Sequence, residues 1–242
     1  MASTVVDVEP VRTADTRLRP VAAFRALRDL ARSEGKDLHA GVAFLRATQG
    51  RSAIRAFARF RAGDVGRRIL DRRIILRDRL LERDALERLP AESLGRSYLA
   101  FMERENVAVP SLLDLAQSCP EVARTAEERL FAERTHVMHD LWHVVAGYGT
   151  EPLGEVCILA IRSAQMRHVG VWILCLGGMR HVENDLGRAR ARAAVREAFT
   201  RGRRAAWLYG VDWEAMLPQP LEAVRRALNL TPPVRYQSAI GA

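Results

Sequence analysis

The apolar residues of this chain recur at intervals of three and four along most of its length, which is the pattern of helices that bury one face. The spacing predicts helices over residues 21–31, 39–61, 64–88, 94–106, 112–118, 130–146, 155–166, 184–210 and 213–230. A break at Gly50 divides the second of these stretches. We find no alternating strand pattern, phosphate-binding loop, dinucleotide-binding glycine fingerprint or solenoid repeat. We therefore predict an all-α, single-domain helical fold with roughly two-thirds or more of its residues in helices.

The N-terminal segment and the longest apolar run indicate where in the cell we expect the protein. The chain has 242 residues, enough to bury a full core, and residues 1–19 form a polar lead that we expect to be disordered. This lead has no continuous apolar segment, so we expect neither a secretory signal nor a transit peptide, and we predict a cytoplasmic protein. The longest apolar run, 169–179, is about half the length that spans a bilayer. We therefore expect any membrane contact to be peripheral.

The basic charge is almost entirely arginine. The formal net charge is +9, and Lys36 is the single lysine. Over 67–84 arginines alternate with acids, which is typical of a solvated helix face rather than a nucleic-acid surface. Seven arginines stand between Arg188 and Arg204, so this stretch is the best candidate for a helix that meets anionic lipid or a partner. A solvated face is the alternative there.

Three histidines and two carboxylates gather near the middle of the chain. If 130–146 is helical, then His136, His139, Asp140 and His143 fall within about a quarter of its circumference. Gly147, Gly149, Pro152 and Gly154 must then end this helix, and Glu155 opens a second one. We predict a helix hairpin that returns Glu155 to the histidine stripe.

Imidazole and carboxylate ligands suit zinc, iron, manganese or nickel, and no cysteine lies in the stripe. The three cysteines, Cys119, Cys157 and Cys175, are far apart and are expected to be small core residues. The alternative for the stripe is a hydrogen-bonded polar face, but its apolar neighbours favour burial. We predict a divalent metal site.

These residues resemble a known family. The spacing His-Asp-x-x-His followed after eleven residues by Glu, here His139, Asp140, His143 and Glu155, is similar to the signature of the Coq-four family of ubiquinone biosynthesis proteins. The segments 89–102 and 211–230 and the position of Gln165 are also similar, so the resemblance covers a helical domain over about 20–235. Departures from the family pattern occur at Thr135 to Val137 and at Leu159 to Arg162.

The resemblance implies a divalent metal, zinc being the usual ion, held by His139, Asp140, His143 and Glu155. It also implies removal of the carboxylate at ring carbon C1 of a polyprenylated hydroxybenzoate, with hydroxylation of that carbon in an oxidative variant. Asp140 is the best candidate for a catalytic residue, and we expect His136 near the ion but outside its ligand set. The partners implied are a polyprenylated aromatic lipid, other ubiquinone biosynthesis proteins and the inner face of the membrane. Association with a second copy of the chain stays open.

Two other functions compete with a decarboxylase. The first is a non-catalytic scaffold that binds prenylated intermediates for other enzymes and uses the metal only to organise its site. The second is a metal-dependent phosphohydrolase, suggested by His139-Asp140. That architecture needs a histidine well upstream, and the nearest one outside the stripe is His39, about a hundred residues away. This distance makes the phosphohydrolase the least favoured of the three.

Overall fold

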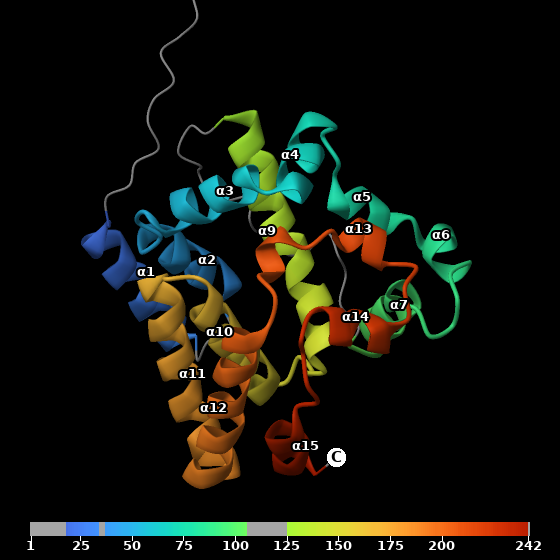
Figure 1. Ribbon diagram of the computed structural model, residues 1–242. Coiled ribbons are helices and arrows are strands. Elements are labelled where there is room, and N and C mark those ends of the chain that lie inside the picture. Colours follow the sequence, from blue (N-terminus) through green and yellow to red (C-terminus); the bar gives the residue numbers. More distant parts are fainter. Residues whose placement is uncertain (1–17, 34–36, 106–124, 242) are drawn as a thin grey trace, which may run out of the picture.

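Helices form the regular structure of the part of the protein that the computed structural model describes, residues 18–33, 37–105 and 125–241 (Figure 1). Within these ranges the single extended pairing is an isolated antiparallel bridge between Ser93 and Pro220. The predicted all-α fold is therefore confirmed. The predicted helix at 112–118, Cys119 and most of the predicted lead lie outside the described residues.

The first half of the chain contains short helices, and the second half contains the longer ones. The N-terminal elements are α1 (Pro20–Arg32), α2 (Leu38–Ala47), α3 (Ser52–Ala62), α4 (Asp64–Asp71), α5 (Leu76–Leu81), α6 (Arg83–Glu87) and α7 (Leu94–Glu105). The C-terminal elements are α9 (Ala126–Ala146), α10 (Pro152–Gln165), α11 (Val169–Leu186), α12 (Arg188–Arg204), a 3-10 turn (Leu208–Gly210), α13 (Trp213–Met216), α14 (Leu221–Ala227) and α15 (Val234–Ile240).

Three predicted helices prove to be several shorter ones. The prediction of a single helix over 64–88 is wrong. The helix ends because Arg73 adopts a left-handed backbone (φ 50°) and the Ile74 N–H donates to the Ile69 carbonyl, 3.0 Å away. The run 213–230 is also wrong, because Pro218 and Pro220 stand in its middle and separate α13 from α14. The run 184–210 contains the end of α11, all of α12 and the 3-10 turn.

The central helix α9 joins two groups of elements. On one side α10, α11 and α12 pack together, and α15 lies against α12 (Figure 1). The alanines of α12 at 191, 194 and 198 are fully buried, so this helix approaches its neighbours closely. On the other side α9 contacts α5, α7 and α14. The side chains of α9 therefore lie between both groups, where most of them are buried.

Two arginines hold the C-terminal end of α9. Arg201 donates from Nη2 to the Ala146 carbonyl at 2.8 Å, and Arg225 donates to the carbonyls of Val145 (3.1 Å) and Val144 (3.0 Å). The last carbonyls of a helix lack partners within the helix, and its dipole favours positive charge there. Arg201 is thus a structural residue, 5% exposed, and not part of a solvated or lipid-facing arginine surface.

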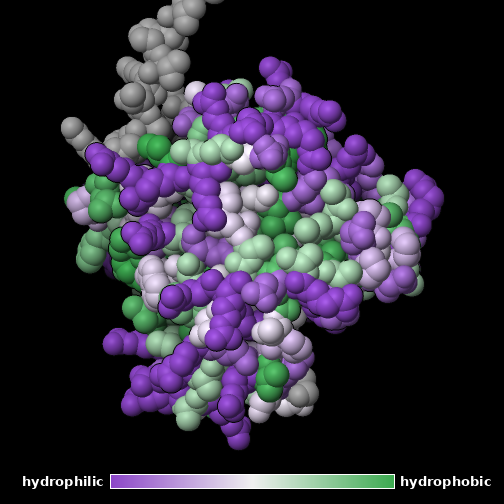
Figure 2. All heavy atoms as spheres, in the orientation of Figure 1, coloured by the Kyte–Doolittle hydropathy of each residue, from purple (hydrophilic) through white to green (hydrophobic). Residues whose placement is uncertain are grey.

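Much of the molecular surface in Figure 2 is hydrophilic, with hydrophobic atoms scattered between the charged side chains. Among the described residues, α11 carries the predicted apolar run, and no helix there is long and apolar enough to cross a membrane.

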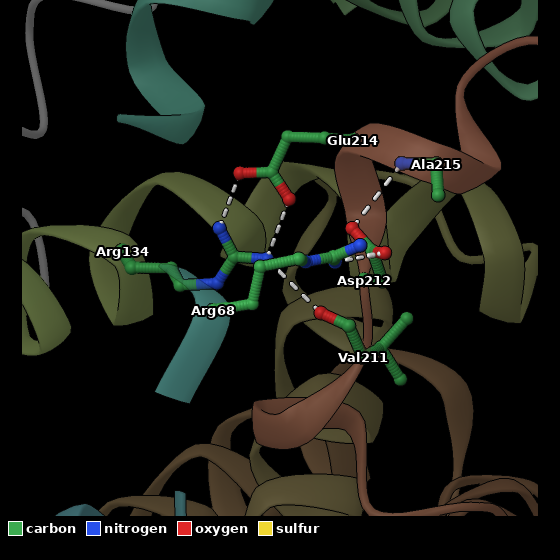
Figure 3. A network of polar contacts seen from close by, with 6 residues as sticks. All are labelled: Arg68, Arg134, Val211, Asp212, Glu214 and Ala215. Carbon is green, nitrogen blue, oxygen red and sulfur yellow. Dashed lines mark hydrogen bonds and ion pairs between the residues drawn. The ribbon is translucent and has the colours of Figure 1, made fainter. Parts of the chain in front are cut away.

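A polar network fixes α9 to α13 and to the two residues before it (Figure 3). Arg134 of α9, with a side chain 1% exposed, donates to both carboxylate oxygens of Glu214 and to the Val211 carbonyl, the latter from Nη2 at 3.0 Å. Arg68 of α4 pairs with Asp212 beside it, and Asp212 also caps α13 by accepting from the Ala215 N–H. Three elements that are far apart in the sequence meet here.

Candidate metal centre

Two histidines of α9 and one glutamate of α10 face one another. His139 and His143 lie one turn apart on α9, with ring centroids separated by 4.8 Å. Glu155 Oε1 lies 3.4 Å from His143 Nε2, and Glu155 Oε2 lies 3.8 Å from His139 Nε2. One ligand atom from each of these three residues lies within 4.8 Å of the others. The structure thus brings together three of the four predicted ligands.

A tight turn returns the chain to α9. The helix ends at Gly147 as predicted, in the left-handed conformation that glycine adopts without strain (φ 73°). Helix α10 begins at Pro152, and Glu151 caps it by accepting a hydrogen bond from the Gly154 N–H at 2.9 Å. Glu155 therefore stands in the first turn of α10 and points back at α9.

Residue 154 lies so close to the loop before α10 that only glycine fits there. A Cβ atom there would come within 2.1 Å of the Gly149 carbonyl oxygen, which is too close for any side chain. The same carbonyl oxygen lies 2.9 Å from His143 Nδ1. The close approach of the loop to α10 therefore places a hydrogen-bond acceptor against a ligand imidazole.

This contact defines the protonation of His143. A carbonyl oxygen only accepts, so Nδ1 carries the proton, and the neutral ring presents a lone pair at Nε2. Burial, with the neighbouring His139, lowers the pKa of His143 to about 3, so the ring is neutral at pH 7. Its Nε2 is buried, and among the described residues it has no hydrogen-bond partner. Phe101 stacks on the ring with a centroid distance of 5.7 Å.

Glu155 is the most exposed residue of the three. Its side chain is 43% exposed, whereas that of His143 is 1% exposed. Burial of the carboxyl among its neighbours raises the pKa of Glu155, the charge of His139 opposes this, and the charge of Asp140 adds to it. A positive charge beside the two imidazoles would therefore favour the ionised form of Glu155.

Comparison with known proteins identifies the family. Residues 12–234 match the family model described as "Coenzyme Q (ubiquinone) biosynthesis protein Coq4". The chain belongs to the Coq4 family. A relative from Aedes aegypti, named a mitochondrial ubiquinone biosynthesis protein COQ4 homolog, is 31% identical over 180 residues, which are 70% of this chain and 60% of that protein. A relative from Culex quinquefasciatus is 30% identical over 194 residues, 79% of this chain and 68% of its own length. The chain thus spans 60% and 68% of the lengths of these two relatives.

The fold agrees with this assignment. A crystal structure of a Nostoc punctiforme protein named for ubiquinone biosynthesis superposes with a TM-score of 0.65, covering 90% of this chain and 100% of that one. The two sequences are 18% identical, so the comparison supports the shared fold alone.

Asp140 lies on the other side of His139 from Glu155. Its Oδ1 is 3.5 Å from His139 Nδ1, whereas the Nε2 of the same ring faces Glu155. In this Coq4 chain Asp140 therefore contacts a candidate ligand and lies outside the cluster of three. His139 Nδ1 has no hydrogen-bond partner among the described residues, so the contact with Asp140 at this distance is electrostatic.

His136 and Gln165 have other roles in the structure. His136 donates from Nδ1 to the Ala132 carbonyl at 2.7 Å, and burial lowers its pKa to about 4. It lies one turn before the cluster and is not part of it. Gln165, a further position of the Coq4 resemblance, bonds through its amide to the Gly202 and Ala206 carbonyls and the Leu208 N–H. Gln165 fixes the chain after α12, about 15 Å along α10 from Glu155.

Two residues that shape the site were missed by sequence reasoning. The sequence pattern indicates only a helix breaker at Gly149, yet its carbonyl orients His143. Tyr236, whose hydroxyl accepts a hydrogen bond from the Gly149 N–H at 2.8 Å, lies 93 residues beyond His143. No local pattern in the sequence connects Tyr236 with the metal stripe.

Proposed function

We propose that this Coq4 protein is a metal-dependent enzyme of ubiquinone biosynthesis that removes the carboxylate at ring carbon C1 of a polyprenylated hydroxybenzoate. In the simple reaction the carbon–carboxylate bond breaks, carbon dioxide leaves and the ring carbon takes up a proton. In the oxidative variant the same carbon receives a hydroxyl group and an oxidant such as dioxygen is reduced. The proposed metal ligands are His139, His143 and Glu155, with Asp140 either beside His139 or as a fourth ligand.

The buried Nε2 of His143 carries this proposal. Its lone pair faces Glu155 Oε1 at 3.4 Å, so two acceptors face one another, and the histidine atom is buried without a hydrogen-bond partner among the described residues. This arrangement fits a cation between them. Nitrogen and oxygen donors of this kind, three from the protein with room for a further ligand, are typical of catalytic zinc. The proposed cofactor is therefore a divalent ion, zinc being favoured.

A divalent ion at this site would bind the substrate carboxylate or phenolate and stabilise the negative charge that develops as carbon dioxide departs. The Gly149 carbonyl keeps the His143 ring in one tautomer, and the Asp140 carboxylate lies 3.5 Å from His139 Nδ1, close enough to act on that ring through its charge. The partly exposed Glu155 leaves the cluster open to solvent on one side. We expect the substrate ring to approach from this side.

Metal analysis and single-protein turnover test this function together. We expect close to one divalent ion per chain, and conversion of a prenylated hydroxybenzoate by the purified protein with release of carbon dioxide. A chelator should abolish turnover, and zinc should restore it. Metal binding and co-purified prenyl lipid without turnover would instead support the scaffold alternative. A protein that binds neither metal nor lipid would contradict both.

The membrane surface that we propose is on α11, and the exposed arginines of α12 stay the predicted alternative. Four apolar residues of α11 are between 38% and 57% exposed and recur at helical spacing: Val169, Trp172, Ile173 and Leu176. On α1, Val21 and Phe24 are 63% and 69% exposed, and both helices contribute to one small apolar cluster. Exposed arginines at 167 and 180 flank the α11 stripe. An apolar stripe between cations suits an anionic lipid surface.

Liposome flotation distinguishes this surface from other exposed apolar residues. We expect the protein to float with vesicles of phosphatidylglycerol and phosphatidylcholine, and less so with added salt. Ile173→Glu with Leu176→Glu should abolish flotation. Val234→Glu is the control, because Val234 is 60% exposed but lies on α15. Equal flotation of the double variant and the control would exclude the α11 stripe as the membrane surface.

A further inference from the structure

One residue, Gly149, links the C-terminal helix to the candidate metal centre through its backbone N–H and its backbone carbonyl. The Gly149 N–H donates to the Tyr236 hydroxyl oxygen at 2.8 Å, and the Gly149 carbonyl accepts from His143 Nδ1 at 2.9 Å. His143 Nε2 then faces Glu155 Oε1 at 3.4 Å. Polar contacts thus form a continuous series from α15 to the candidate metal centre, through Tyr236, Gly149, His143 and Glu155.

Other contacts hold the Tyr236 ring in place. The ring is 3% exposed and meets Tyr148 edge to face, with a centroid distance of 4.8 Å. The next residue toward the N-terminus, Arg235, donates its backbone N–H to Glu197 of α12 at 2.9 Å. Helix α15 is therefore anchored by its apolar ring and its backbone. Removing the hydroxyl alone leaves these anchors intact.

The geometry points to Tyr236 as a positioning residue of the metal site, which keeps the Gly149 carbonyl directed at His143. This inference rests on the proposed metal function. A neutral imidazole has two tautomers, and the one present is set by the hydrogen bond that the other ring nitrogen makes. Without the hydroxyl, the Gly149 N–H in the loop between α9 and α10 loses its hydrogen-bond acceptor, and the Gly149 carbonyl is no longer held toward His143. The His143 ring then loses its preference for the tautomer with a lone pair at Nε2.

The test compares Tyr236→Phe with Tyr148→Phe. The second variant also removes a buried tyrosine hydroxyl, one that accepts from Arg201, in contact with the same ring. Tyr148→Phe removes this one buried hydrogen bond, whereas Tyr236→Phe removes the bond from the Gly149 N–H and the contact with the Glu151 side chain, so we expect its loss of thermal stability to be at least as large. Only Tyr236→Phe should weaken binding of zinc, measured by chelator competition, by roughly 10- to 100-fold. The visible spectrum of bound cobalt should change in the same variant.

A second readout does not need the metal. Nitrogen chemical shifts of the His143 imidazole in metal-free protein report the tautomer directly. We expect a single Nδ1–H form in the wild type and in Tyr148→Phe, and a mixture in Tyr236→Phe. If the wild type binds no metal, the proposed function fails, while the tautomer comparison still decides the role of Tyr236.

Unchanged zinc affinity and an unchanged His143 tautomer in Tyr236→Phe would overturn the inference. So would equal weakening of zinc binding by both variants, because the effect would then follow from general loosening. If Tyr236→Phe does not fold, difluorotyrosine at this position keeps the hydroxyl and weakens its oxygen as an acceptor. It should shift the tautomer mixture in the same direction by a smaller amount, and an unshifted mixture would contradict the proposal.

Discussion

Glu155 Oε1 lies 3.4 Å from His143 Nε2, across the hairpin between α10 and α9. Nδ1 of His143 is already engaged by the Gly149 carbonyl, so Nε2 of the neutral ring is an acceptor, as is an ionised carboxylate. Two acceptors at this distance are stabilised by a cation or a proton between them. The metal proposal can be tested most directly at this pair.

Glu155→Ala should lower metal content and activity together, because it removes the one ligand that comes from α10. We expect metal per chain to fall by about tenfold or more, and ubiquinone to be lost in a complementation assay. Glu127→Ala is the matched control, since its carboxylate is 45% exposed and Glu155 is 43% exposed. Wild-type metal and ubiquinone in Glu155→Ala would show that this hairpin is not the functional site.

Asp140→Asn should separate metal binding from activity. Asp140 contacts His139 Nδ1 at 3.5 Å on the side away from Glu155, so its charge acts on the ring rather than from within the cluster. Asparagine has the same shape without the charge. We expect part of the metal to remain and most of the ubiquinone to be lost in complementation. Loss of metal as complete as in Glu155→Ala would instead identify Asp140 as a direct ligand.

The sequence predicted the helix hairpin because its determinants are local. The spacing of His139 and His143 follows from the helical period, and the glycine and proline cluster after them identifies the turn. The return of Glu155 to the stripe follows from the shortness of that turn. The metal-ligand assignment stays a prediction, although the structure places His139, His143 and Glu155 together.

The contacts that orient the site are not local, and for that reason the sequence did not reveal them. Tyr236 contacts Gly149 from α15, and Arg201 contacts Ala146 from α12. A buried structural arginine and a solvated one look alike in a sequence. The break at Arg73 was also hidden, because a left-handed residue that is not glycine carries no clear signal.

Glu214→Gln should strongly destabilise the fold, because Arg134 is almost fully buried and would lose its counter-charge (Figure 3). Removing one partner of a buried ion pair costs about 3 to 5 kcal/mol in the free energy of unfolding, which urea titration measures. Glu103→Gln is the control. Its pair with Arg83 lies at the surface, with both side chains more than half exposed, and should contribute little. Equal effects of the two substitutions would contradict a structural role for the Arg134 pair.

His168 should make the protein less stable in mild acid. Its Nδ1 caps α11 by accepting from the Gly170 and Val171 N–H groups, so the ring must be neutral in the folded state. Burial and the charge of Arg162 lower the pKa of His168 to about 4, from 6.5 in the unfolded chain. The stabilisation is therefore complete above pH 6.5 and is lost as the pH falls toward 4. The full loss is on the order of 3 kcal/mol.

His168→Asn tests this, because asparagine also caps a helix but does not titrate. Urea unfolding at pH values from about 7 to about 4 should give a shallower loss of stability than in the wild type. Some slope will remain, since burial also lowers the pKa values of His136 and His143. His181→Asn controls for removal of an imidazole at the surface, where this side chain is 61% exposed. An unchanged slope in His168→Asn would exclude His168 as a source of the acid sensitivity.

Gly154→Ala should damage the metal centre although residue 154 offers no ligand. The new Cβ would lie 2.1 Å from the Gly149 carbonyl oxygen, so the loop must move away from α10. The Gly149 carbonyl would then no longer accept the hydrogen bond from His143 Nδ1. We expect a loss of about 1 to 3 kcal/mol in the free energy of unfolding, together with weaker zinc binding. Gly177→Ala is the matched control, since it also places alanine within a helix, but its Cβ meets no atom within 4 Å. That control should gain about 1 kcal/mol from better helix propensity and bind zinc as the wild type does. If Gly154→Ala kept full zinc affinity, the Gly149 carbonyl would not be the group that orients His143.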